Sequence, residues 1–327
     1  MLKFDFCMQQ WYDENIKSKY ERHKMIFQKK QMQEAAILYY EKKYTQQEIA
    51  QMMNLSRQTV SKLLNDAIRE NIVEIKIHNP EITCTELEKA LSSQYQINNA
   101  VVCGVSTANE TLCQLLTVKK AANYIQTLVE NGNQKIGISW GRTIQMLINE
   151  FPQTNSVNNI VFPLFGATDQ EKSYFQSNEL ARSFADKLNA GVKYAWFPYR
   201  PDSLEDCNLL KNTSYYKKIF KLWNNIDIAI VGIGSSEIIQ TFGKEFGYHE
   251  QCFSAVGDIS THFFDINGEF IDLYENTLCV SKDNFKNTKH VVAIACGTNK
   301  VEAIVGALRT GMIDTLITDE YTAKKIL

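Results

Sequence analysis

The spacing of apolar residues divides the chain of 327 residues into a short helical part and a long part of mixed pattern. Over 33–69, apolar side chains recur at intervals of three and four, which is typical of amphipathic helices. From residue 99 onward, short apolar runs alternate with helical patterns. Such alternation indicates a parallel sheet that is covered by helices on both faces. The sequence therefore predicts an α/β protein.

Seven apolar runs are predicted strands, at 100–105, 135–139, 159–166, 193–198, 228–234, 291–297 and 315–318. Helical patterns lie at 111–130, 142–150, 176–189, 211–223, 299–310 and 319–327. This succession predicts a Rossmann-like domain. Ligands of such domains bind at the carboxyl ends of the strands, so the loops that follow the strands are where a site is expected.

The N-terminal part has the pattern of a winged helix-turn-helix. Helical patterns lie at 33–41, 47–53 and 57–71. Thr45 and Glu48 have the spacing of a capping box, and Asn54 and Ser56 suit a tight turn followed by a helix cap. The alternating segment 72–77 predicts a strand, which would form the wing.

The last of these helices has polar residues in its first turns, where a recognition helix contacts base edges in the major groove. Arg57 suits a guanine and Gln58 an adenine, and the other polar side chains suit bases or phosphates. The candidate DNA-binding residues are Gln46, Ser56, Arg57, Gln58, Thr59, Ser61 and Lys62. The alternative is a helical hairpin whose polar face is simply solvated.

Asn79–Pro80 is the predicted domain boundary, because proline disfavours helix in the residue before it. A helical pattern follows at 85–95. Four parts are predicted, in the order N-terminal helical arm (1–30), helix-turn-helix domain (31–80), linker helix (81–98) and effector-binding domain (99–327). The arm is rich in aromatic and basic residues, and either a helix packed between subunits or a partly ordered arm fits it.

Charge and composition add two points. Residues 1–80 contain 13 Lys and Arg against 10 Asp and Glu, whereas the rest of the chain contains 22 against 27, so only the first part suits a polyanion. No apolar run reaches the ~18 residues that span a bilayer, and the N-terminus lacks the pattern of a secretory signal. The eight cysteines form no CxxC pair, which indicates reduced thiols. A cytoplasmic protein with no membrane contact is expected.

Four loops after predicted strands carry candidate binding residues. Trp140–Thr143 combines a glycine, an arginine and a hydroxyl before a helix, which suits an anion. Ser235–Ser236 and Cys296–Lys300 are further polar loops, and Asp258 and Asp265 can accept hydrogen bonds from sugar hydroxyls. Together these loops predict a phosphate at one end of a ligand and hydroxyls at the other. Glycines after strands are common in parallel sheets, so each loop alone is weak.

Motifs for metals, nucleotides or nucleophilic catalysis do not occur, so no metal or cofactor is expected. An enzyme remains the alternative reading, as a sugar-phosphate isomerase or deaminase with an N-terminal assembly domain. Its candidate bases would be Asp258, Asp265 and Glu179, and Lys300 could form a Schiff base. Nothing in the sequence pairs these carboxylates with a suitable acid.

Several segments in order along the chain resemble the SorC family of bacterial sugar-responsive transcription regulators. They are TQQEIAQMMNLSRQTVSKLLNDA, GISWGRTI, VFPLFG, SNELARSFADKLNA, AIVGIG, AVGDI, FFDINGEFID and ACGTNKVEAIVGALRTGMIDTLITDEYTAKKIL. The resemblance covers most of 33–327. It implies a domain similar to sugar-phosphate isomerases that binds a phosphorylated sugar or signalling molecule, a homodimer or homotetramer, and operator DNA as a partner.

By position in the family motifs, the resemblance implies effector-binding roles for Trp140, Gly141, Arg142, Thr143, Gly166, Asp258, Asp265 and Lys300. The chain departs from the family in three places. Trp140 and Arg142 are bulkier than the residues of some members, and Cys296 replaces a smaller residue. The expected function is a DNA-binding regulator whose operator affinity is controlled by a phosphorylated sugar or related metabolite; the identity of that effector stays open.

Overall fold

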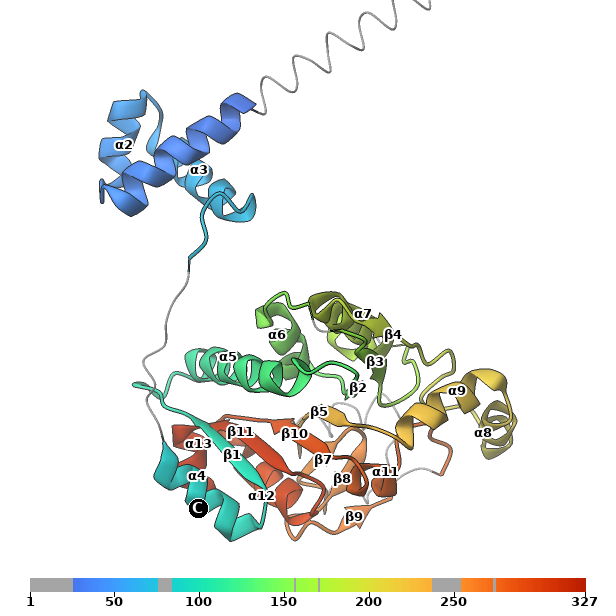
Figure 1. Cartoon of the computed structure of the whole chain (residues 1–327). Helices are drawn as coiled ribbons and strands as arrows, with labels where there is room; N and C mark the ends of the chain where they lie inside the picture. Colours follow the sequence, from blue (N-terminus) through green and yellow to red (C-terminus); the bar gives the residue numbers. More distant parts are fainter. Residues whose placement is uncertain (1–25, 76–83, 156, 170, 237–253, 273–274) are drawn as a thin grey trace, which may run out of the picture. The chain divides into compact units, whose positions relative to one another are not determined.

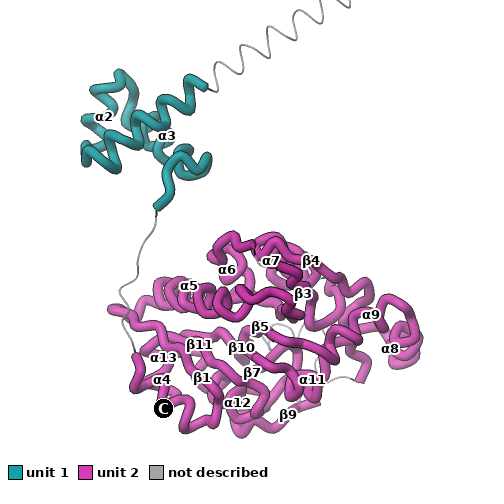
Figure 2. The backbone as a smooth tube through the Cα atoms, in the orientation of Figure 1, with its two compact units in different colours: residues 1–80 teal, residues 81–327 magenta. Residues whose placement is uncertain are grey.

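The structure is a computed structural model that describes residues 26–75, 84–155, 157–169, 171–236, 254–272 and 275–327. The chain forms two compact units, residues 1–80 and residues 81–327 (Figure 2). Each unit has an apolar core of its own. Most of the predicted N-terminal arm lies outside the described residues, as does the predicted boundary at Asn79–Pro80.

The N-terminal unit consists of helices around one small core. A helix over 26–36 continues into the π-helical turn η1 (Ile37–Glu41), and α2 (Gln46–Met53) and α3 (Arg57–Arg69) follow. The buried side chains that meet in this core include Ala35, Ile49, Val60, Leu64 and Ala67. The apolar spacing in the sequence is therefore that of the buried helix faces.

Hydrogen bonds at the helix ends explain where α2 and α3 begin. The Thr45 hydroxyl accepts a hydrogen bond from the Glu48 N–H at 3.3 Å, and the Glu48 carboxylate accepts one from the Thr45 N–H at 2.7 Å. Asn54 takes the left-handed conformation, with φ of 54°, and Ser56 Oγ accepts from the Thr59 N–H at 3.0 Å. The tight turn joins α2 and α3 into a helix-turn-helix.

The predicted wing strand at 72–77 has no strand conformation in its first four residues; the rest lies outside the described residues. Asn71, with φ of 55°, reverses the chain after α3. The N–H groups of Ile72 and Val73 then donate to the Ala67 carbonyl, at 2.8 and 3.1 Å. Ile72 and Val73 pack against the core of the unit. These two residues are therefore apolar because they pack against the core at the end of α3, and not because they form a strand.

The second unit is built on a parallel sheet, as predicted. Within the described residues its seven strands lie in the order β1 (Asn99–Cys103), β11 (Thr315–Asp319), β10 (His290–Ile294), β5 (Ile228–Gly232), β2 (Lys135–Ile138), β3 (Ile160–Pro163) and β4 (Gly191–Val192). Every pair of neighbours is parallel. The carboxyl ends of these strands therefore share one edge of the sheet.

Helices cover both faces of the sheet (Figure 1). One face packs against α5 (Glu110–Val129), α6 (Arg142–Glu150) and α7 (Ser177–Leu188). The other packs against α4 (Thr85–Tyr95), α9 (Ser214–Trp223), α12 (Val301–Arg309) and α13 (Glu320–Ile326). In β5, Ile228 and Ile230 belong to the first core and Ala229 and Val231 to the second. This two-sided burial is why the strands are apolar throughout.

The described residues also form an antiparallel sheet of four short strands, which was not predicted. Its order is β6 (Gly234–Ser235), β7 (Gly257–Ile259), β8 (His262–Phe264) and β9 (Phe270–Ile271). Further short elements are η2 (Ser173–Phe175), α8 (Leu204–Lys211), α11 (Lys282–Lys286) and η4 (Thr298–Lys300). This sheet could not be predicted from the sequence, because strands of two or three residues are too short to show an alternating pattern.

The strand predicted at 193–198 is wrong. Only Gly191 and Val192 pair with β3, as β4. Farther along, the amide side chain of Asn178 on α7 takes the place of a neighbouring strand. Its Oδ1 accepts from the Ala195 N–H at 2.9 Å, and its Nδ2 donates to the Ala195 carbonyl at 3.0 Å. An apolar run therefore lies at the sheet edge without being a strand.

Candidate functional site

The first turns of α3 present polar side chains to solvent. Arg57, Gln58, Thr59 and Lys62 are exposed, whereas Val60 is fully buried. Of the other candidate DNA-binding residues, Ser56 is exposed, and Gln46 and Ser61 are partly exposed. The Ser56 hydroxyl caps α3 and lies 2.8 Å from that of Thr59, so these two side chains also shape the start of the helix.

Sequence reasoning missed the loop before α2. Lys42, Lys43 and Tyr44 are exposed there, and Lys43 has a positive φ of 61°. The first helix of a helix-turn-helix generally crosses the DNA backbone, so these two lysines are further candidates for phosphate contacts. The signal was the run KKY directly before the capping box.

A cavity of about 280 Å³ lies at the carboxyl ends of β2, β5 and β10. Six of the eight candidate effector residues line it, namely Trp140, Gly141, Arg142, Thr143, Asp258 and Lys300. They come from the loops that follow β2 and β10 and from β7. The cavity therefore occupies the edge of the sheet where a ligand was expected.

The loop after β2 forms one wall. Gly141 has a φ of 112°, which L side chains rarely adopt, and it precedes α6 with no side-chain cap. The first N–H groups of a helix have no partner within it and carry the positive end of the helix dipole. Arg142 and the buried Thr143 follow at this end of α6. The wall is suited to an anion.

The loop after β10 forms a second wall of similar design. Gly297 has a φ of 109° and leads through η4 to Lys300, whose Nζ donates to the Ile233 carbonyl at 2.7 Å. Burial lowers the pKa of Lys300 and nearby Arg142 lowers it further, while Cys296 and Asp258 oppose them. Two cationic side chains thus face the same cavity.

Asp258 contributes the carboxylate. Burial raises its pKa to about 6, although the Thr261 N–H, which donates to the carboxylate at 3.1 Å, and Lys300 both act to lower it. Gly234 allows this placement, because a Cβ there would lie 1.9 Å from Asp258 Oδ1. The carboxyl group can accept hydrogen bonds from ligand hydroxyls, and protonated it can donate one.

Aromatic rings form the next part of the wall. The Trp140 ring has centroid distances of 4.5 Å to Phe165, 5.5 Å to Phe175 and 6.0 Å to Tyr199. Trp140, Phe175 and Tyr199 line the cavity. The bulky Trp140 is therefore held at the cavity by ring contacts.

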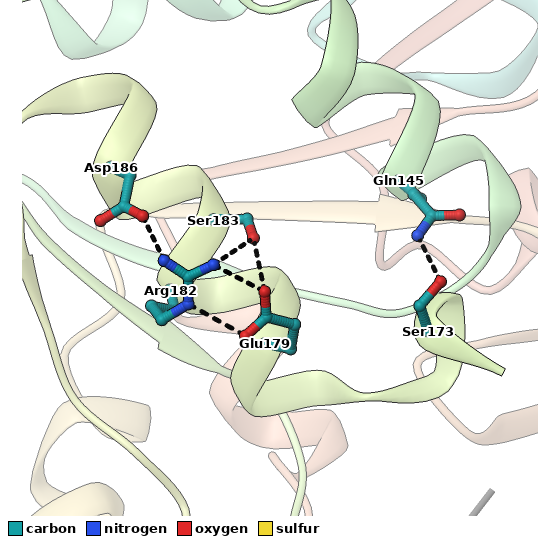
Figure 3. A network of polar contacts seen from close by, with 6 residues as sticks. All are labelled: Gln145, Ser173, Glu179, Arg182, Ser183 and Asp186. Atoms are coloured by element: carbon teal, nitrogen blue, oxygen red, sulfur yellow. Dashed lines mark hydrogen bonds and ion pairs between the residues drawn. The ribbon is translucent and has the colours of Figure 1, made fainter. Parts of the chain in front are cut away.

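Hydrogen bonds attach η2 to the start of α6. The Gly141 N–H donates to the Tyr174 carbonyl at 2.7 Å, and Gln145 Nε2 donates to Ser173 Oγ at 2.7 Å (Figure 3). Phe175, at the end of η2, is thereby held at the cavity. This connection could not be predicted from the sequence, because η2 is only three residues long.

Glu179 belongs to a separate network on the exposed side of α7 (Figure 3). The Arg182 guanidinium bridges Glu179 and Asp186, and Ser183 Oγ donates to Glu179 at 3.1 Å. The hydrogen bond from Arg182 lowers the pKa of Glu179. Glu179 is not among the residues that line the cavity, so it is not placed as a general base there.

Two candidate effector residues do not line the cavity. Gly166 lies against backbone, since a Cβ there would come within 2.6 Å of the Pro198 carbonyl and the Tyr199 nitrogen. Asp265 caps a turn, where its Oδ1 accepts from the N–H groups of Asn267 and Glu269, each at 2.9 Å. In this structure both residues make local contacts within the fold, and a motif match does not separate such a role from binding.

Several cavity residues were missed by sequence reasoning: Glu110, Gln114, Ser139, Phe175, Tyr199, Ser260 and Thr261. Ser139 lies directly before the loop Trp140–Thr143 that was singled out, which was a usable signal. Glu110 and Gln114 lie in the first turns of α5, at the same edge of the sheet. Cys296 also lines the cavity, and burial raises the pKa of its thiol to about 12, so it stays neutral.

In the part of the chain that the structure describes, no cluster of three His, Cys, Asp or Glu side chains could hold a metal ion. Among the helices of that same part of the chain, none has the length and apolar character to cross a membrane.

Comparisons with known proteins agree with both units. The family model described as "Putative sugar-binding domain" matches residues 79–327, and the model "Sigma-70, region 4" matches residues 30–70. The sorbitol operon regulator of Klebsiella pneumoniae is 30% identical over 302 residues, which cover 89% of this chain and 96% of the regulator. Its full-length crystal structure has a TM-score of 0.70 at 29% identity, and the match covers 90% of this chain and 97% of that one.

The deoxyribonucleoside regulator of Bacillus subtilis (strain 168) is 27% identical over 302 residues, covering 90% of this chain and 96% of the relative. A helix-turn-helix unit followed by a sugar-binding domain defines a DNA-binding transcription regulator. This chain belongs to the SorC family of such regulators. The relatives are named as regulators of transcription, which supports regulation and not catalysis.

Proposed function

We propose that this regulator binds a phosphorylated sugar or a related phosphorylated metabolite in the cavity, and that binding changes its affinity for operator DNA. The observation that carries the proposal is the pair of loops after β2 and β10. Each has a glycine with φ near 110° directly before a helical segment, and each supplies a cationic side chain, Arg142 or Lys300. Glycine loops that open helices are common binding sites for phosphate.

The electrostatics of the two cations favour a dianion between them. Burial lowers the pKa of Lys300 most, and Arg142 lowers it further because the two positive charges repel each other. A phosphate group would relieve this repulsion and accept charge-assisted hydrogen bonds from both.

The remaining polar groups suit ligand hydroxyls. Asp258, Asn299 and Gln114 line the cavity together with the anion loops. Two relatives are named as a sorbitol operon regulator and a deoxyribonucleoside regulator. These names support a polyol or a sugar as the effector. We assign the effector role to Trp140–Thr143, Asp258 and Lys300, and no longer to Gly166 or Asp265.

At the other end of the chain, α3 is proposed to read the operator through Arg57 and Gln58, with Ser56, Thr59, Ser61, Lys62 and Gln46 as supporting contacts. Recognition helices bind half-sites about one helical turn apart, so a homodimer or homotetramer is proposed. The effector would act by binding more tightly to one of two arrangements of the assembly.

The test is a thermal-shift screen of the full-length protein against pentose, hexose and hexitol phosphates and their unphosphorylated parents. A ligand of the native state raises the melting temperature by mass action. We expect a rise with at least one phosphorylated compound and none with its parent. Equal shifts for both would contradict the phosphate site.

Arg142→Ala examines the loop itself. The loss of one charge-assisted contact is expected to weaken binding of the best phosphorylated ligand by about tenfold or more. Arg182→Ala is the matched control, because Arg182 lies on the exposed α7 network. If Arg142→Ala and Arg182→Ala bind that ligand equally well, the assignment of the loop is wrong.

A further inference from the structure

The hairpin of β7 and β8 has an unusual turn. Ile259 and His262 are paired across it, so Ser260 and Thr261 form a two-residue connection. Both have positive φ, 46° and 73°. Such turns normally contain Asn, Asp or Gly, because other side chains are strained in this conformation. The strain is greatest for Thr261, whose side chain is β-branched.

The turn is bonded to both ends of the cavity. Ser260 Oγ donates to Ser139 Oγ at 2.9 Å, and the two side chains are 2% and 1% exposed. Ser139 directly precedes the loop Trp140–Thr143, which is called the anion loop below. On the other side, the Thr261 N–H donates to the Asp258 carboxylate at 3.1 Å. A single strained turn therefore connects the anion loop with the carboxylate.

We propose that Ser260 and Ser139 are positioning residues that hold Asp258 at a fixed place relative to the anion loop, and so make the cavity select phosphorylated polyols over phosphate alone. The inference rests on the proposed function and adds the element that sets selectivity. Strained backbone persists where the surroundings impose it, and it is concentrated at functional sites. Asn-Gly would form this turn without strain but would lack the hydroxyl that reaches Ser139.

The test compares inorganic phosphate with tetritol, pentitol and hexitol phosphates by calorimetric titration of the full-length protein. Selectivity is the affinity of the best polyol phosphate divided by that of inorganic phosphate. Ser260→Ala is expected to lower selectivity about tenfold and to change phosphate affinity less than about twofold. Ser139→Ala should have the same effect, and the double variant should be no worse than either single one.

Two variants separate positioning from folding. Ser177→Ala is the matched control, because its buried hydroxyl donates to the Gly166 carbonyl at 3.2 Å away from the cavity. It should lower Tm without changing selectivity. Thr261→Gly should raise Tm, because glycine relaxes a positive φ, and should lower selectivity because the turn loosens. If the turn had only a structural role, Thr261→Gly would not raise Tm while it lowers selectivity.

The outcomes are distinct. If the native protein binds both ligand classes and Ser260→Ala and Ser139→Ala keep full selectivity, the positioning role is wrong while the proposed function stands. Should Ser260→Ala fail to fold, Ser139→Ala and Thr261→Gly decide the question. If the native protein binds neither inorganic phosphate nor any polyol phosphate, the phosphate site is wrong and this inference fails with it.

Discussion

Among single residues, Asp258 combines burial, a nearby cation and a position in the cavity. Burial raises its pKa to about 6, so in the unliganded protein the carboxyl group ionises only at a cost. An acid whose folded-state pKa is raised contributes stability that is present at low pH. That contribution is complete below about pH 4 and is lost as the pH rises through 6.

Asp258→Asn is therefore expected to stabilise the unliganded protein at pH 8, by up to about 2–3 kcal/mol, and to change it little at pH 4. Asparagine retains the oxygen that accepts from the Thr261 N–H and never ionises. Urea unfolding at the two pH values measures the difference. A gain that is equal at both pH values, or larger at pH 4, would show that the carboxyl group of Asp258 is not the cause.

The binding residues that could be predicted from the sequence are those that directly follow a clear apolar strand. Trp140–Thr143 and Lys300 follow strong apolar strands, so their place at the sheet edge followed from the topology. Ser260 and Thr261 were missed because their type of turn is ordinarily recognised by Asn or Gly. Asp265 had suitable chemistry, but its carboxylate is used within its own turn.

Among the elements, α2 and α3 begin at side-chain caps, and each cap bonds to a residue only three positions away in the sequence. The capping box of Thr45 and Glu48 was predicted and is present. By contrast, β4 ends after two residues, and farther along the chain Asn178 on α7 bonds to the Ala195 backbone, which a strand would otherwise use for pairing. Most helices and the apolar strands could therefore be predicted from local sequence patterns. The edge of the sheet depends on contacts between separate elements, which those patterns do not contain.

Thr45→Ala should destabilise α2 by about 1 kcal/mol, because the Glu48 N–H loses its acceptor. Hydrogen exchange of the full-length protein, followed by mass spectrometry, should show faster exchange in α2 and unchanged exchange in the second unit. Thr213→Ala, which removes the cap of α9, is the matched control and should act only there. Faster exchange throughout both units after Thr45→Ala would contradict a local role for the cap.

On the scale of the whole molecule, the chain joins a basic helix-turn-helix unit to an acidic sugar-binding domain. The separate cores mean that each unit can fold around its own apolar residues. Regulation then requires that the effector distinguish two states of the assembly that bind DNA differently. DNA binding should weaken with salt, because lysine and arginine displace counterions from phosphates.

The most direct test of the central claim is a titration of full-length protein with DNA that it has itself selected from random duplexes. Fluorescence anisotropy would give Kd with and without the sugar phosphate that most raises Tm. We expect a change in Kd of about fivefold or more with the phosphorylated compound and none with its unphosphorylated parent. The same Kd at saturating sugar phosphate would show that this ligand does not control operator binding.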